Sequence, residues 1–436
     1  MDTNSFVAPG PVSFKSPIND PSLRNSLASI VSALESLPAW AGVLGTNLSD
    51  GRVVFRKPPP FALDDDPSGE AVPLRDRDMN RIRHWFEIEL SVQLSRQNLI
   101  DAVHIVADKH AFHPVRDYLT SLSWDGRPRV ELWLERFAAV RPPGEAEATL
   151  VRSVARKWLV STVARAMQPG CKVDTILILE GRQGIGKSRA LATLAGPRFF
   201  SDAAIDFGVK DACQTIQGVW IYELAELDAI LRRDPSTVKA FLSRATDRFR
   251  VPYGRTPESV PRGVVFAGTV NHGAYLRDTT GNRRYWVVRC EGALDVEGLA
   301  GARDQLWAEA LHLYRAGETW HLDPTHERSM ADEADARVEQ DPWEEPLAAW
   351  TAARGTFSMD EVLDDALGLR TSSKNSHVTV RVSRLLSRLG YERRRRATLP
   401  RAYHYVRVDV PASHRPSRPE QTPELPFAAS HPRSHR

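Results

Sequence analysis

Gly181-Arg182-Gln183-Gly184-Ile185-Gly186-Lys187-Ser188 matches the pattern G-x-x-x-x-G-K-[ST] at every fixed position. The apolar run from Thr175 to Glu180 predicts a short buried strand before this stretch, and Gly186 to Ala195 predicts a helix after it. A glycine-rich loop between a strand and a helix can turn successive backbone N–H groups toward phosphates, and the helix N-terminus adds a favourable dipole. The stretch therefore predicts a phosphate-binding loop, and the flanking elements argue against a glycine-rich turn with no ligand.

ATP and Mg²⁺ are the cofactors that such a loop implies. Lys187 would neutralise the β and γ phosphates, and the hydroxyl of Ser188 would ligate the metal. The predicted nucleotide-binding residues are Gly181, Gln183, Gly184, Ile185, Gly186, Lys187, Ser188 and Arg189.

Hydrolysis of ATP also needs an acidic group at the end of a neighbouring strand. Val219 to Tyr222 predicts that strand, and Glu223 and Glu226 follow it. Glu223 is the candidate metal ligand, while either glutamate could be catalytic, because two residues separate them. The alternative for each glutamate is a place in a solvated helix start.

Polar residues near two later strands complete the candidate catalytic set. Asn271 follows the predicted strand Val264 to Gly268, where its side chain could reach the γ-phosphate. Arg283 and Arg284 stand at the start of the last predicted strand. A guanidinium can stabilise the charge that develops in phosphoryl transfer, although paired arginines also form solvated or DNA-facing edges.

Predicted strands alternate with helices from about Leu150 to Leu322, which favours a largely parallel sheet with crossover helices. The predicted fold is an α/β P-loop ATPase core flanked by a mainly helical N-terminal domain and a C-terminal winged helix. The expected parts are a flexible leader (1–20), the helical domain (21–140), the ATPase domain (141–325), an acidic linker (326–345), the winged-helix domain (346–410) and a disordered tail (411–436).

Positive charge is concentrated near the C-terminus, although the net charge of the 436 residues is only +3. Between Arg370 and Arg407 there are eleven Lys or Arg residues and one acid, Glu392. The predicted helix from His377 to Leu389 has one apolar stripe, and a predicted hairpin wing follows it. The candidate DNA contacts here are Arg381, Arg384, Arg388 and Arg394. An arginine-rich solvated helix with no DNA role is the alternative.

These residues, in this order, resemble the virulence-associated E family, P-loop proteins related to the superfamily 3 helicases and the pox-virus-type primase-helicases. The resemblance rests on GRQGIGKS, WIYELAELD, KAFLSRATDRFRVPY, the strand-end TVN and GNRRYW. It extends upstream to FHPVRDYLTSLSWDGRPR and PGCKVDTILILEG, and so covers most of the region from about residue 100 to 320.

The resemblance implies a hexameric ATPase that translocates on single-stranded or forked DNA. Asn271 would be the phosphate sensor, and Arg283 or Arg284 would be a finger that reaches into the next subunit. A hairpin inserted at about Phe249 to Val265 would grip DNA in the central channel. Its candidate contacts are Arg248, Arg250, Tyr253, Arg255 and Arg262. Many relatives carry a primase domain in front of the helicase, for which this chain has too few residues, so priming would come from a separate protein.

The overall composition is that of an ordinary globular protein, with 42% hydrophobic and 26% charged residues. No apolar run approaches the roughly 20 residues of a membrane helix. The expected location is the cytoplasm of a bacterial host cell, and no membrane partner is expected.

The leading hypothesis is an ATP-dependent helicase or translocase for the replication of a phage or mobile element. An ATP-switched initiator that binds origin DNA without processive unwinding is the alternative. A P-loop kinase for a small molecule is disfavoured by the combined glutamate, sensor and arginine set.

Overall fold

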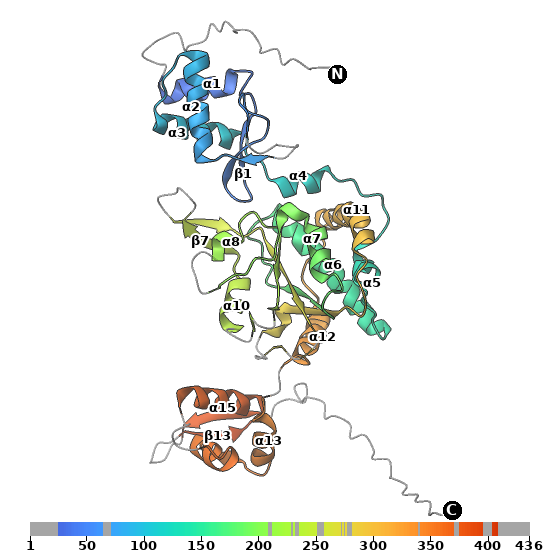
Figure 1. The fold of residues 1–436 in the computed structure, drawn as a ribbon. Helices are drawn as coiled ribbons and strands as arrows, with labels where there is room; N and C mark the ends of the chain where they lie inside the picture. The colour runs from blue at the N-terminus through green and yellow to red at the C-terminus, as the bar shows by residue number, and fades with distance from the viewer. Residues whose placement is uncertain are drawn as a thin grey trace, which may run out of the picture. The chain divides into compact units, whose positions relative to one another are not determined.

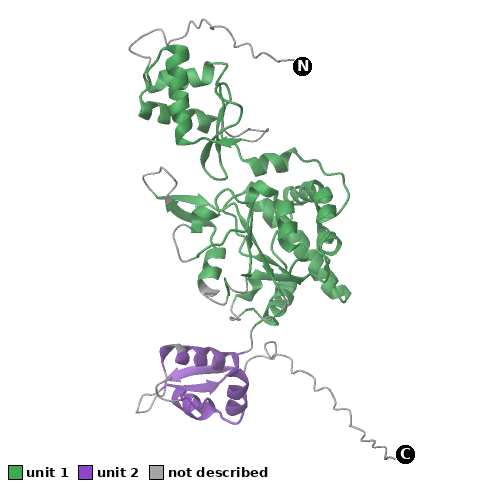
Figure 2. Cartoon of the chain, in the orientation of Figure 1, with its two compact units in different colours: residues 1–339 green, residues 340–436 purple. Residues whose placement is uncertain are grey.

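The computed structural model describes residues 25–63, 71–207, 212–227, 230–231, 235–250, 257–271, 273, 275–276, 281–338, 341–369, 375–395 and 403–408. The chain divides into two compact units, residues 1–339 and residues 340–436 (Figure 1, Figure 2). No helix in the described part of the chain is both long and apolar enough to cross a membrane.

A five-stranded parallel sheet forms the centre of the first unit. Its strands, in spatial order, are β10 (Tyr285–Arg289), β4 (Ile176–Glu180), β9 (Val265–Val270), β6 (Ile221–Leu224) and β5 (Phe200–Ser201). All five residues of β4 are buried, as expected for a parallel strand covered on both faces. This sheet confirms the predicted α/β class of the core.

Helices cover both faces of the sheet, because alternate residues of each strand point to opposite sides. Leu177 and Leu179 belong to one buried cluster, and Ile176 and Ile178 belong to the other. Figure 1 shows α6, α7 and α11 on one side of the sheet and α8 and α10 on the other. The helices of this core are α4 (Pro114–Ser121), η2 (Val130–Leu132), α5 (Trp133–Phe137), α6 (Glu145–Met167), α7 (Lys187–Ala195), η3 (Pro197–Phe199), α8 (Ala212–Thr215), α10 (Pro235–Leu242), η4 (Asn282–Arg284), α11 (Val296–Arg315) and α12 (Pro324–Asp335).

The N-terminal part of this unit combines helices with a small antiparallel sheet. Its elements are α1 (Leu27–Ser36), β1 (Leu44–Asn47), β2 (Arg52–Phe55), β3 (Val72–Pro73), α2 (Asp76–Leu90) and α3 (Arg96–Lys109). Strands β1 and β2 form a hairpin around Asp50-Gly51, and β3 adds a third strand to it. These elements enclose a separate buried cluster around Trp40, whose ring contacts Phe61, Trp85 and Phe86.

The boundary expected at residue 140 falls inside the core cluster. Val115 and Leu119 of α4 and Trp133 of α5 are buried with the side chains that cover the sheet. Residues 114–140 therefore pack with the α/β core and not with the N-terminal cluster.

The segment expected to be an acidic linker is instead part of the core along most of its length. Helix α12 begins at Pro324 and buries Met330 and Ala334 against the sheet unit, and Val338 is buried as well. Its acidic residues face outward or pair with arginines, which is why the composition alone resembles a solvated segment. This prediction was wrong.

An antiparallel hairpin, β7 (Thr246–Arg250) and β8 (Pro257–Pro261), precedes β9 where the insertion was predicted. A buried ion pair closes its base: Nε of Arg262 donates to Oδ2 of Asp247 at 2.8 Å, and both side chains are at most 1% exposed. The guanidinium also lies 4.5 Å from the ring centroid of Phe241. Arg262 therefore cannot contact DNA, and its assignment as a DNA contact is corrected to a structural role.

The second unit packs two longer helices against a three-stranded antiparallel sheet in the order β11-β13-β12. Its elements are α13 (Glu344–Ala352), β11 (Thr356–Phe357), α14 (Met359–Glu361), the π-helical turn η5 (Val362–Ala366), α15 (Ser376–Arg388), β12 (Tyr391–Arg395) and β13 (Tyr403–Arg407). Ser358 and Glu361 form a capping box at the start of α14. Leu347, Phe357 and Leu386 lie in its small buried core.

We expect Asp247→Ala to lower the free energy of unfolding by about 3–5 kcal/mol, because the buried Arg262 guanidinium would lose its countercharge. Thermal unfolding followed by circular dichroism measures this change. Arg248→Ala removes an exposed side chain from the same strand and should change stability by less than about 0.5 kcal/mol. Equal midpoints for the two variants would show that the ion pair does not hold the hairpin.

Candidate phosphate-binding and catalytic site

The backbone of the glycine loop adopts conformations that side chains would oppose. Gly184 and Gly186 have φ values of +80° and +98°, in the region that favours glycine. A Cβ added at Gly181 would lie 2.7 Å from the carbonyl oxygen of Cys290. Helix α7 begins directly after Gly186, so its free N–H groups lie at the loop. The loop thus has the curvature and the donors that a polyphosphate needs.

Lys187 lies folded against this loop. Its Nζ donates to the carbonyl oxygens of Gly181 at 2.6 Å and Arg182 at 2.7 Å. Burial lowers the pKa of Lys187 from its usual value. Phosphate oxygens would offer the ammonium charged acceptors, which form stronger hydrogen bonds than neutral carbonyls.

A carboxylate meets the first turn of α7 beside the loop. Oε1 of Glu223 accepts hydrogen bonds from Ser188 Oγ at 2.7 Å and from Thr269 Oγ1 at 2.6 Å. Glu223 is 1% exposed, and its Oε2 has no hydrogen-bond partner among the described residues. A serine hydroxyl beside a carboxylate with a free oxygen fits a hydrated Mg²⁺ ion, which is bound through oxygen ligands and retains several waters.

The topology explains how Glu223 reaches the loop. The sequence predicts that β6 neighbours β4, but β9 lies between these two strands. Thr269, near the end of β9, fills that intervening position and donates to Glu223. Glu226 lies beyond β6 with an exposed side chain and a φ of +51°. The structure therefore brings Glu223, and not Glu226, to Ser188.

The other predicted residues near the loop are open to solvent. The side chains of Gln183, Ser188 and Arg189 are exposed, and Asn271 is exposed directly after β9. Because β4 and β9 are parallel and adjacent, Asn271 and the phosphate loop lie at the same edge of the sheet. This placement is compatible with the sensor role expected for Asn271.

The two candidate finger arginines differ in exposure. The side chain of Arg283 is 54% exposed and forms an ion pair with Glu327 at 2.8 Å. The side chain of Arg284 is 21% exposed; its Nε donates to Ser243 Oγ at 3.0 Å and lies 3.6 Å from Asp174. Exposure favours Arg283 over Arg284 for contact with another subunit.

Two residues beside the loop were missed by sequence reasoning. Glu180, the last residue of β4, is buried and binds Arg337, which follows α12. Glu180 ends the run ILILE, whose other residues are apolar, and this position was the available sequence signal for it. The sequence carried no signal for Arg337, which lies in the stretch expected to be a linker.

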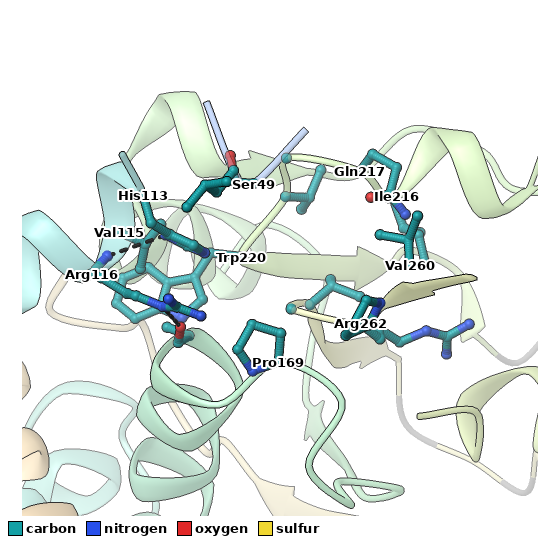
Figure 3. A pocket seen from close by; sticks show the side chains of 17 residues that line it. Ser49, His113, Val115, Arg116, Pro169, Ile216, Gln217, Trp220, Val260 and Arg262 are labelled. Atoms are coloured by element: carbon teal, nitrogen blue, oxygen red, sulfur yellow. Dashed lines mark hydrogen bonds between the residues drawn. The ribbon is translucent and has the colours of Figure 1, made fainter. Parts of the chain in front are cut away.

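A cavity of about 260 Å³ lies at the other edge of the sheet (Figure 3). Ser49, His113, Arg116, Trp220 and Val264 are among the residues that line it. Trp220 directly precedes β6 and Val264 directly precedes β9, so the cavity marks the amino ends of the strands. Burial lowers the pKa of His113 to about 4, and its neutral Nδ1 accepts from the backbone N–H of Arg116. Nucleotides bind at the carboxyl ends in such sheets, so this cavity is not the phosphate site.

The predicted DNA contacts of the hairpin divide into three groups. Arg248 is exposed on β7, and Arg250 is the last residue of that strand. Tyr253 and Arg255 lie outside the described residues. Arg262 is buried, as described above.

In the second unit, two predicted contacts are tied to acidic side chains. Nε of Arg381 donates to Asp341 at 2.8 Å, and its guanidinium lies 3.9 Å from the ring centroid of Trp343. Arg388 forms an ion pair with Glu344 at 3.3 Å. These contacts fix α15 to α13 and the residues before it, and they reduce the charge available to a nucleic acid.

The other two predicted contacts of this unit are more accessible. Arg384 is exposed on α15 and forms no ion pair with the described residues. Arg394 is exposed on β12 and lies 3.3 Å from Glu392. A basic helix face and a basic hairpin strand are thus both present on this unit.

A family model described as the virulence-associated protein E-like domain matches residues 119–339. No protein with a curated description matches the chain. Three solved apo structures of the NrS-1 C-terminal region are similar to it. The first has a TM-score of 0.48 and 11% identity, with 88% of this chain and 99% of that chain covered. The second has a TM-score of 0.44 and 10% identity, with 84% of this chain and 96% of that chain covered. The third has a TM-score of 0.43 and 9% identity, with 87% of this chain and 99% of that chain covered. Similarity at this level carries no information about activity.

We expect Glu223→Gln to reduce kcat for ATP hydrolysis by about a hundredfold or more, the usual contribution of a positioned acid–base group. The amide can still accept from Ser188 and Thr269, so the fold and the affinity for a fluorescent ATP analogue should persist. Glu226→Gln is the matched control and should retain activity. The reverse result, an active Glu223→Gln and an inactive Glu226→Gln, would move the catalytic role to Glu226.

Proposed function

This chain belongs to the virulence-associated protein E-like family, and we propose that it is an ATP-dependent DNA helicase or translocase for the replication of a phage or mobile element. The observation that carries the proposal is the contact of Ser188 and Thr269 with the buried Glu223 beside a glycine loop that holds Lys187. A phosphate-binding loop with a carboxylate at its serine is suited to hydrolysing ATP rather than only binding it.

Each residue of the site has a distinct role in this proposal. The loop N–H groups and Lys187 would bind the phosphates, and Ser188 and Glu223 would hold Mg²⁺, which supplies positive charge to the phosphates when bound. Glu223 would also orient the attacking water through the carboxylate oxygen that has no hydrogen-bond partner among the described residues. Thr269 keeps the carboxylate in place, since its hydroxyl donates to the other oxygen. Asn271 contacts the γ-phosphate.

DNA would bind through two basic elements. Arg248 on the β7–β8 hairpin is an exposed cation on an element inserted before β9. In the second unit, α15 and the β12–β13 hairpin support assignment as a winged helix, with Arg384 on the helix and Arg394 on the wing. Such contacts would be made mainly to phosphates, which give affinity without sequence specificity.

The assembly we propose is a homo-oligomeric ring, with six subunits as the expected number. In a ring, an exposed arginine of one subunit can complete the site of its neighbour. The greater exposure of Arg283 supports it, rather than Arg284, as this residue. A separate primase would supply primers.

ATP turnover measured with single-stranded DNA, duplex DNA and no DNA tests the proposed function. We expect strong stimulation by single strands, and no turnover by Lys187→Ala under any condition, because the ammonium that binds the phosphates is absent. A chain that ends at residue 338 should bind DNA more weakly and with a shallower salt dependence, while its basal turnover should persist.

Two other outcomes would change the proposal. Tight sequence-specific binding to duplex DNA with no stimulation by single strands would favour the initiator. Turnover with a small-molecule acceptor and no response to DNA would favour a kinase.

The ring predicts recovery of activity when two inactive variants are mixed. Lys187→Ala has a defective loop but supplies Arg283, whereas Arg283→Ala has an intact loop and supplies no arginine. Hydrolysis should return at interfaces where an intact loop meets an intact arginine, and a parallel mixture with Arg284→Ala identifies which arginine acts. No recovery with either arginine variant, although differently tagged variants co-purify as mixed rings, would place the arginine within its own subunit.

A further inference from the structure

A buried ion pair joins the strand that carries the phosphate loop to the segment after α12. Glu180 is the residue directly before Gly181 and is 6% exposed. Its Oε2 accepts from Nε of Arg337 at 2.7 Å and from the hydroxyl of Tyr275 at 3.4 Å. The ion pair therefore holds the Arg337 side chain against the residue that directly precedes the loop.

The backbone of the same arginine binds a second segment of the site. The carbonyl oxygen of Arg337 accepts from the N–H groups of Tyr275 at 2.9 Å and Leu276 at 3.0 Å. Tyr275 and Leu276 are buried and follow the candidate sensor Asn271 by four and five positions. Arg337 thus binds the loop strand through its side chain and the sensor segment through its main chain.

Helix α12, which leads into Arg337, also holds the arginine turn η4. Asn282 donates to Asp335 at 2.7 Å, and Arg283 pairs with Glu327 at 2.8 Å. The residue before the loop, the sensor segment and the arginine turn therefore all contact one short stretch of chain, residues 327–337.

We propose that Arg337 is a positioning residue for ATP hydrolysis, which fixes the phosphate loop relative to the segment that carries Asn271. The inference rests on the proposed function. Buried ion pairs add little net stability compared with apolar pairs of similar volume, because desolvation offsets their attraction. The directional contacts of this pair instead fix the phosphate loop relative to the segment that carries Asn271. A displacement of about 1 Å between groups that act on the substrate can cost about a hundredfold in rate.

The test separates positioning from stability with neutral replacements. Arg337→Gln removes the guanidinium that faces the buried Glu180 carboxylate, so the thermal midpoint of this variant should fall. The double variant Glu180→Gln/Arg337→Gln carries neither charge of the pair and should recover most of that midpoint. We expect kcat to stay about ten- to a hundredfold low in both variants, with a much smaller change in KM for ATP. Arg328→Ala removes an exposed arginine from α12, the helix that leads into Arg337. This variant is the control and should have wild-type kcat.

Wild-type kcat in the double variant, with its midpoint restored, would overturn the inference and leave only a structural role for the pair. The proposed function would survive that result, because the wild-type chain would still hydrolyse ATP. A wild-type chain that does not hydrolyse ATP with single-stranded DNA would overturn the proposed function, and this inference with it.

Discussion

Parallel hydrogen bonding of β4, β9 and β6 forces the carboxyl ends of these strands onto one edge of the sheet. Glu180, Thr269 and Glu223 lie at the ends of those three strands, and the phosphate loop leaves the same edge. The apolar residues of each strand are covered on both faces, so the polar residues at this edge have the sheet as a rigid base. The site depends on this constraint, because each element supplies only some of the residues of the site.

Local pattern was enough to predict the sheet and the loop. The strand and helix around Gly181 to Ser188 follow from an apolar run and a glycine motif, which are short-range signals. The choice between Glu223 and Glu226 could not be made in this way. It depends on which glutamate faces Ser188 across an intervening strand, and that strand follows 40 residues later in the chain.

Charge was the least reliable guide to position. Arg262 appeared among basic residues of a hairpin, but its partner Asp247 and the Phe241 ring make its burial favourable. The acidic composition of residues 326–345 suggested a linker, but the apolar residues Met330 and Ala334 are spaced one helical turn apart and dock α12 on the core. In both cases the deciding partner is distant in sequence.

The contact of Lys187 with the carbonyls of its own loop has a consequence for ligand selectivity. The ammonium donates to the carbonyl oxygens of Gly181 and Arg182, so a ligand that binds Lys187 has to replace two short hydrogen bonds. Under the proposed function, a lone inorganic phosphate would offer few contacts to offset that loss, whereas a triphosphate would also engage the loop N–H groups and Ser188. The loop would then discriminate by the number of phosphates as well as by charge, and the abundant small anions of a cell would compete poorly for it.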